Sequence, residues 1–300
     1  MSVWPGFPPA GMTAMLIGIL IAETLFAVSL RNYRRISYVI TYIIALAVFA
    51  FHAWYFIDQR ALNKYPSEFS HISYFIFSVS VIVGGRKMQS LASFCGLVTG
   101  IGFIIGGCFS PASMLSDAEN GATLVISVLR HEILYLGGLL LFLNVGRFYV
   151  KDIWIPFLGI ALIVVYSLLM YHGIIYPDFA KPEGMVIVKI VYGTILGYVI
   201  PGELPVWLRV FTVILVLALV VGAMFGFYAG NRKLNALRDR KNAHKGKIYG
   251  EGKPSLRNSA TMELGLFPLA VYLLKRAGKW KTPKKTFEKR DIGAEKIESE

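Results

Sequence analysis

The amino-acid sequence predicts an all-α fold, a polytopic transmembrane helical bundle with seven spans. Of its 300 residues, 55% are hydrophobic and only 16% are charged, and the mean hydropathy is +0.57, whereas soluble domains carry about 25% charged residues. The apolar residues form blocks of roughly twenty, which lets a helix cross a hydrocarbon core of about 30 Å. Because the blocks do not alternate apolar and polar residues, we expect helices and not a barrel.

Seven apolar blocks are expected to span the membrane. In chain order they are 11–30, 36–57, 66–84, 88–108, 123–145, 153–172 and 206–229. Cytoplasmic loops are rich in Lys and Arg, and the odd-numbered connections carry such residues: Arg31, Arg34, Arg35, Arg86, Lys87, Arg147 and Lys151. The second connection has balanced charges and the fourth is acidic. We therefore expect the N-terminus outside and the C-terminus in the cytoplasm.

Charge and hydropathy divide the chain into a spanning domain, 1–230, and a basic tail, 231–300. The tail holds +10 of the net charge of +13. Anionic inner-leaflet lipids attract such a segment as well as nucleic acid does, so we expect lipid partners and no nucleic acid. An interfacial helix is expected near 260–278, where an apolar stretch ends in basic residues. A contact with another protein is the alternative interpretation.

Residues 185–200 are apolar, but the segment is shorter than the roughly twenty residues that cross a bilayer. It also contains Lys189. A further span here would place the basic tail outside, against the charge pattern. A short re-entrant or interfacial helix on the outer face is therefore expected.

Four of the five histidines lie near the outer ends of predicted spans: His52, His71, His131 and His172. Ionisable residues within spans usually face a bundle interior or a water-filled cavity, so these imidazoles predict a polar cavity open to the outside. The alternative is that histidine simply suits the membrane interface. That alternative has most force for His52 and His172, which lie nearest the predicted boundaries.

The fifth predicted span places three ionisable residues in succession, Arg130, His131 and Glu132. Successive helical side chains point about 100° apart, so neighbouring helices must receive them separately. Glu23, alone in the first predicted span, is a candidate counter-ion for Arg130. Structural ion pairing alone explains Arg130 and Glu132 but not His131.

Ser73 is a candidate nucleophile with His131 as its base across the bundle, although serine also packs well in membrane helices. In the fourth predicted span, Gly96–Gly100 and Gly102–Gly106 have the spacing of close helix packing. The two cysteines do not suggest a disulfide framework. No Walker A, H-E-x-x-H, G-x-S-x-G or C-x-x-C motif is present, so neither a cofactor nor a metal site is predicted.

Residues 70–144 resemble the bacterial YwaF-type integral membrane family, which is related to eukaryotic transmembrane acyltransferases. The resembling segments are FSHIS, LASFCGLVTGIGFIIGGCFSP and LRHEILYLGGLLLFLN. The resemblance implies a bacterial cell membrane location and chemistry on lipid acyl groups. Where the family pattern implies His-x-Cys, this chain has His71-Ile72-Ser73, which puts thioester chemistry in doubt.

Three functions remain open from the sequence. The first is a membrane-embedded enzyme that transfers or hydrolyses a lipid acyl ester, with Ser73 as nucleophile, His131 as base and His71 as orienting group. In that reading His172, Arg130 and Glu132 bind the substrate. The second is a transporter or ligand-binding membrane protein, and the third is a scaffold without catalysis.

Overall fold

The computed structural model describes residues 9–59, 65–112, 115, 121–177, 185–198, 200 and 202–248. Within these ranges every regular element is a helix and there is no strand. The main helices are α1 (Pro9–Ser29), α2 (Arg34–Gln59), α3 (Phe69–Val83), α4 (Arg86–Phe109), α6 (Gly121–Leu140), α7 (Trp154–Tyr171), α8 (Val186–Val191) and α9 (Val206–Ile248). The predicted all-helical class is confirmed.

Six of these helices are long and apolar enough to cross a membrane: α1, α2, α4, α6, α7 and α9. The third predicted span corresponds to α3, which has only 15 residues and is about 22 Å long at the helical rise per residue. It ends early because Gly84 and Gly85 adopt positive φ angles of 76° and 88°, which only glycine tolerates readily. Seven full-length spans are therefore not established in the described chain.

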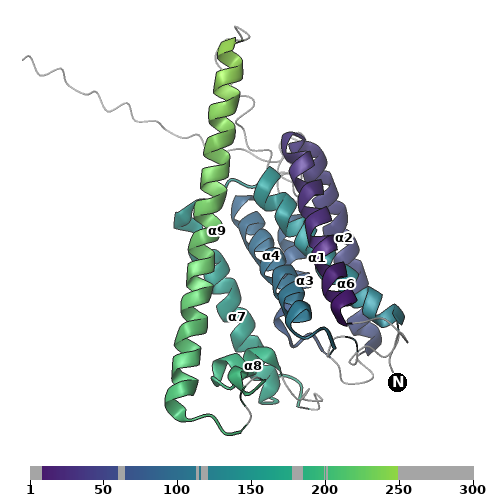
Figure 1. Ribbon diagram of the computed structural model, residues 1–300, viewed down its shortest axis with the longest axis vertical. Helices are drawn as coiled ribbons and strands as arrows, with labels where there is room; N and C mark the ends of the chain where they lie inside the picture. The colour runs from purple at the N-terminus through teal and green to yellow at the C-terminus, as the bar shows by residue number, and fades with distance from the viewer. Residues whose placement is uncertain are drawn as a thin grey trace, which may run out of the picture.

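Successive helices run in alternating directions along one bundle, with α4 and α6 near its centre and α9 along one flank (Figure 1). The odd-numbered connections meet at one end, where Arg86 pairs with Asp152 at 3.0 Å and Arg147 pairs with Asp239 at 2.7 Å. The residues that precede α3 and follow α7 meet at the other end. There Tyr65 stacks on Tyr176 with the ring centroids 4.2 Å apart. Near the end of α7, the Ser167 hydroxyl also donates to the Ser67 carbonyl at 2.9 Å.

Large apolar side chains cover the outside of the bundle. Leu25 on α1 is 64% exposed, Trp54 on α2 is 63% exposed and Ile214 on α9 is 60% exposed. Water disfavours an apolar surface of this extent around a soluble domain, whereas lipid tails solvate it. The exposed apolar surface and the six long apolar helices make this a polytopic membrane protein.

Glycines bring α4 and α6 into close contact. A Cβ at Gly96 would lie 2.8 Å from the Leu134 carbonyl oxygen, and one at Gly100 would lie 2.3 Å from Tyr135 Cβ. The Gly96–Gly100 packing prediction is therefore confirmed. The second pair, Gly102–Gly106, does not pack in this way, because a Cβ at either glycine would meet nothing within 4 Å.

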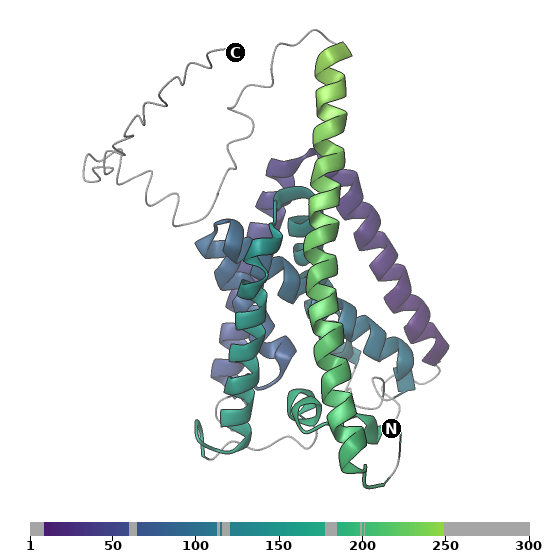
Figure 2. The ribbon, with the colours of Figure 1, turned by 90° about the vertical axis from the view of Figure 1, so that its left-hand side faces the viewer.

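The predicted helix at 185–200 is shorter than expected. It consists of α8, six residues long, followed by a 3₁₀ turn at Ile195–Tyr198. Gly193 separates the two with a φ of 68°, and a Cβ there would lie 2.2 Å from the Arg209 carbonyl oxygen. Figures 1 and 2 show α8 lying crosswise to the long axis of the bundle, and it is not among the helices long enough to cross a membrane.

The last helix, α9, continues without interruption from the predicted span into the basic tail and has 43 residues. Asn231 joins it to the segment that follows α6. Its amide oxygen accepts from the Phe148 N–H at 2.8 Å, and its amide nitrogen donates to the Phe142 carbonyl at 2.7 Å. The interfacial helix expected near 260–278 lies outside the described residues.

Candidate functional site

Three helices bring five polar side chains together inside the bundle. His52 comes from α2, His71 and Tyr74 from α3, and Arg130 and His131 from α6. Arg130 interacts electrostatically with all four of the others, and His71 interacts with both other imidazoles. We call this group the imidazole–arginine cluster. The expectation that His52, His71 and His131 share one polar region agrees with this placement.

His131 is held in one orientation. Its Nδ1 lies 2.7 Å from the Ser127 carbonyl oxygen, so Nδ1 carries the proton, because a carbonyl can only accept. Its ring stacks on Phe103 with the centroids 3.9 Å apart and meets Tyr74 edge-on at 5.7 Å. A neutral imidazole fixed in this way keeps Nε2 as an acceptor and therefore as a base.

His52 is similarly fixed, since its Nδ1 lies 2.8 Å from the Val48 carbonyl oxygen. Its ring stacks on Tyr74 with the centroids 3.7 Å apart. Tyr74 is fully buried and contacts both His52 and His131, so it is the central member of the cluster. The sequence alone does not single out Tyr74, because a tyrosine in an apolar helix gives no functional signal of its own.

Ser73 and His131 do not form a hydrogen bond. The Ser73 Oγ is buried, and the group that it interacts with is the Cys95 thiol of α4. Ser73 and Tyr74 lie on different faces of α3, and Tyr74 is the residue directed at His131. The Ser73–His131 pair expected from the sequence is therefore not hydrogen-bonded in this structure.

Glu132 points away from the cluster toward α1, where it interacts with Glu23. Glu23 is therefore the neighbour of another carboxyl group and not the expected counter-ion of Arg130, and neither ion pair among the described residues involves Arg130. Beside this carboxyl pair, the Thr24 and Tyr135 hydroxyls lie 3.0 Å apart.

His172 lies apart from the other three histidines. It follows the last turn of α7 and is exposed, and its Nε2 lies 2.9 Å from the Tyr192 hydroxyl oxygen just after α8. This contact joins the end of α7 to the segment that follows α8.

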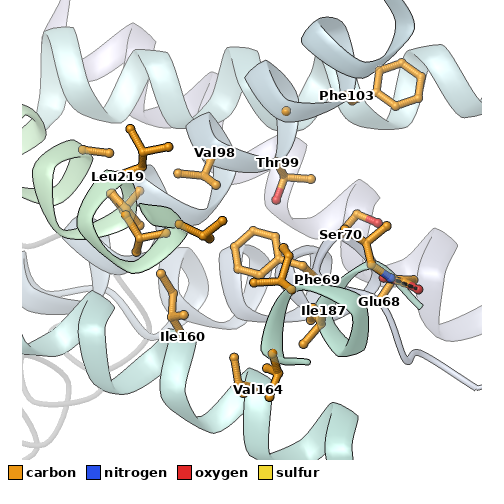
Figure 3. Close-up of a pocket in the computed structure, with 18 of the residues that line it drawn as sticks. Glu68, Phe69, Ser70, Val98, Thr99, Phe103, Ile160, Val164, Ile187 and Leu219 are labelled. Atoms are coloured by element: carbon orange, nitrogen blue, oxygen red, sulfur yellow. Dashed lines mark hydrogen bonds between the residues drawn. The ribbon is translucent and has the colours of Figure 1, made fainter. Parts of the chain in front are cut away.

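A cavity of about 820 Å³ lies between α4, α7, α8 and α9, beneath the start of α3. Apolar side chains make up most of its wall, among them Phe94, Val98, Ile160, Val164, Ile187, Val216 and Leu219. Its polar groups are few: Glu68, Ser70, Thr99 and His131. Figure 3 shows the oxygen atoms of Glu68, Ser70 and Thr99 on one side and Leu219 and Ile160 on the other.

Glu68 precedes α3 and lies outside the six spanning helices. Its Oε1 accepts the Val186 N–H at 3.2 Å, which joins the start of α3 to α8. Burial raises the pKa of the Glu68 carboxyl, and the hydrogen bond from Val186 acts in the opposite direction. The cavity therefore has an ionisable group at its polar side.

Ser70, Thr99 and Glu68 are site residues that the sequence analysis did not select. Ser70 adjoins His71 in the FSHIS segment, so the sequence does place a serine of the cavity wall beside a candidate histidine. The candidate nucleophile predicted from that segment was its other serine, Ser73. Among the described residues, no group of three His, Cys, Asp or Glu side chains could hold a metal ion.

Comparison of the chain with protein families, with curated proteins and with solved structures gave no match.

Proposed function

We propose that this membrane protein binds an amphipathic lipid in the cavity between α4, α7, α8 and α9. The separation of polar from apolar wall residues carries the proposal. Glu68, Ser70, Thr99 and His131 offer hydrogen bonds to a head group, and the rest of the wall suits a hydrocarbon chain. The volume of about 820 Å³ falls within the ordinary range for ligand pockets, roughly 300–1,000 Å³.

Chemistry on an acyl ester at the polar side is the enzymatic form of this proposal. His131 supports it, because the bond from Nδ1 to the Ser127 carbonyl leaves Nε2 free to act as a base. Ser70 replaces Ser73 as the candidate nucleophile, since Ser70 shares the cavity with His131. Hydrolysis by a water molecule activated by His131 is the variant without a serine intermediate.

The orientation that we propose has the N-terminus and the α8 end of the bundle outside, and the tail in the cytoplasm. The alternating helix directions favour seven crossings, with α3 as a short one between α2 and α4 (Figure 1). The ion pairs of Arg86 and Arg147 lie at the opposite end, as the charge rule for cytoplasmic loops requires. The lipid head group would then enter from the outer leaflet.

Lipid binding is tested by a pair of valine substitutions on α9. Val216 lines the cavity, whereas Val210 is 53% exposed on the outside of the helix. The purified full chain, washed in mild detergent, should retain a lipid that mass spectrometry identifies. Val216→Trp should remove it by filling the cavity, and Val210→Trp should retain it. Equal retention by both variants would reject the cavity as the binding site.

The enzymatic form has a separate test. If a retained lipid is an acyl ester, its turnover should fall in His131→Gln and Ser70→Ala, while Ser73→Ala retains it. Turnover that depends on Ser73 and not on Ser70 would restore the pairing expected from the sequence. Retention of lipid without turnover in any condition would leave binding or transport as the function.

A further inference from the structure

The imidazole–arginine cluster contains several buried polar atoms that have no hydrogen-bond partner. They are His52 Nε2, His71 Nδ1, Tyr74 Oη and Arg130 Nε. His52 is 1% exposed and Tyr74 is 0% exposed, so water does not satisfy them from outside. Most buried polar atoms in proteins are paired, and each unpaired one carries a cost. Four such atoms in one cluster indicate a site that a ligand completes.

The positive charge of the cluster indicates that the ligand is an anion. Arg130 keeps its positive charge under all ordinary conditions, and the ion pairs among the described residues do not include it. A cation within a membrane bundle is costly without a counter-charge. The planar guanidinium matches an oxyanion such as carboxylate, sulfate or phosphate.

The donors and acceptors of the cluster distinguish between these oxyanions. Arg130 Nε can only donate, whereas the Nε2 of neutral His52 can only accept, because its Nδ1 proton is directed at the Val48 carbonyl. A ligand that satisfies both must carry a negative oxygen and an acidic hydrogen. A phosphate group that retains one proton has both, whereas sulfate and carboxylate at neutral pH have only the negative oxygens.

We propose that the imidazole–arginine cluster binds a phosphate group that retains a proton. Arg130 Nε donates to a phosphate oxygen, the phosphate hydroxyl donates to His52 Nε2, and the Tyr74 hydroxyl donates to a second phosphate oxygen. The proposal is separate from lipid binding in the cavity, because only His131 of the cluster lines that cavity. The phosphate is either a free anion or the monoester head group of a lipid such as phosphatidic acid.

The test uses the full chain in phosphatidylcholine nanodiscs, with ligand affinity measured from the shift in thermal unfolding. Inorganic phosphate and short-chain phosphatidic acid are titrated separately, with sulfate as the control anion. Binding of inorganic phosphate identifies a free anion, and binding of phosphatidic acid alone identifies a lipid head group. Sulfate should produce no shift in either case.

Two variants assign the binding to the cluster. Tyr74→Phe removes only the hydroxyl and keeps the ring that stacks on His52, and Arg130→Gln removes the charge. Each should weaken phosphate binding by about 10- to 100-fold, the loss typical of a hydrogen bond to a charged group. Tyr33→Phe is the control, since Tyr33 is 57% exposed in the connection between α1 and α2.

Tyr74→Phe keeps the test decisive if Arg130→Gln fails to fold, as judged by its elution profile. The proposal is overturned if neither phosphate ligand shifts unfolding, if Tyr74→Phe binds as tightly as the parent chain, or if sulfate binds as tightly as phosphate.

Discussion

At the scale of single residues, buried amides stabilise the bundle at positions where the backbone leaves helical geometry. The chain leaves α6 through a π-helical turn at Leu141–Val145, and such turns leave backbone groups in need of other partners. Asn144 is fully buried and donates to the Ala27 carbonyl at 2.9 Å and to the Ser37 hydroxyl at 3.1 Å. It thereby joins the turn that follows α6 to both α1 and α2.

Asn231→Ala should destabilise the protein much more than Asn235→Ala, one turn further along α9. Asn231 satisfies the Phe148 N–H and the Phe142 carbonyl, and each buried group left unpaired costs about 1–3 kcal/mol. Asn235 bonds mainly to its own helix and to Gly146. Thermal unfolding in detergent measures both, and equal losses would contradict the role given to Asn231.

Glu68→Gln should raise stability at neutral pH and flatten its dependence on pH. Burial raises the pKa of Glu68 above its ordinary value of 4.5, so the folded chain holds this proton more tightly than the unfolded chain. Stability therefore falls as pH rises from about the ordinary value through the raised one. Glutamine keeps an acceptor for the Val186 N–H and removes the charge.

Unfolding temperatures measured from acidic to neutral pH check this prediction. The parent chain should lose stability relative to Glu68→Gln as the pH rises. A difference between the two that is independent of pH would mean that the Glu68 carboxyl does not titrate in that window.

At the scale of helices, the contact between α4 and α6 supports the cluster, because α6 carries Arg130 and His131. Gly100→Ala should force the two helices apart, since its Cβ would lie 2.3 Å from Tyr135 Cβ and 3.2 Å from the His131 carbonyl oxygen. Overpacking of this kind costs about 1–3 kcal/mol. Gly106→Ala is the matched control on the same helix, with open space around its Cβ.

Unfolding of both variants in detergent gives the comparison. Gly106→Ala should be neutral or slightly stabilising, because alanine favours a helix over glycine by about 1 kcal/mol. If Gly100→Ala were as stable as Gly106→Ala, the close approach of α4 and α6 at Gly100 would not contribute to the stability of the fold.

Residues 262–280 should bind anionic membranes without crossing them. Their thirteen-residue apolar part, 262–274, is too short to span and is followed by Lys275, Arg276 and Lys279, each worth about 1 kcal/mol at an anionic surface. A synthetic peptide should bind phosphatidylserine vesicles at low salt and weaken as salt rises. Binding that salt does not weaken would remove the electrostatic part of the prediction.

At the scale of the whole molecule, the two ends of the bundle differ in chemistry. One end holds the ion pairs of Arg86 and Arg147, and the other joins Glu68 to Val186 and His172 to Tyr192. Reporter fusions at Met1 and after Gly230 should report outside and cytoplasmic locations respectively. A translocated tail would overturn the proposed orientation and the entry of lipid from the outer leaflet.

The sequence by itself determined that this chain is a helical membrane protein and where its long helices lie. Hydropathy acts along the chain, so blocks such as 123–145 and 206–229 identify the helices Gly121–Leu140 and Val206–Ile248. The sequence also indicated that His52, His71 and His131 lie at similar depth, because depth follows from counting along each helix.

Only the tertiary structure decided which faces meet. Helix rotation places Tyr74, and not Ser73, against His131, and it turns Glu132 toward Glu23. The cavity gathers Ser70, Thr99 and Val216 from separate helices, and no spacing along the chain encodes that meeting. Side-chain direction changes by about 100° per residue, so an error of one residue in a predicted facing directs a different side chain at the neighbouring helix.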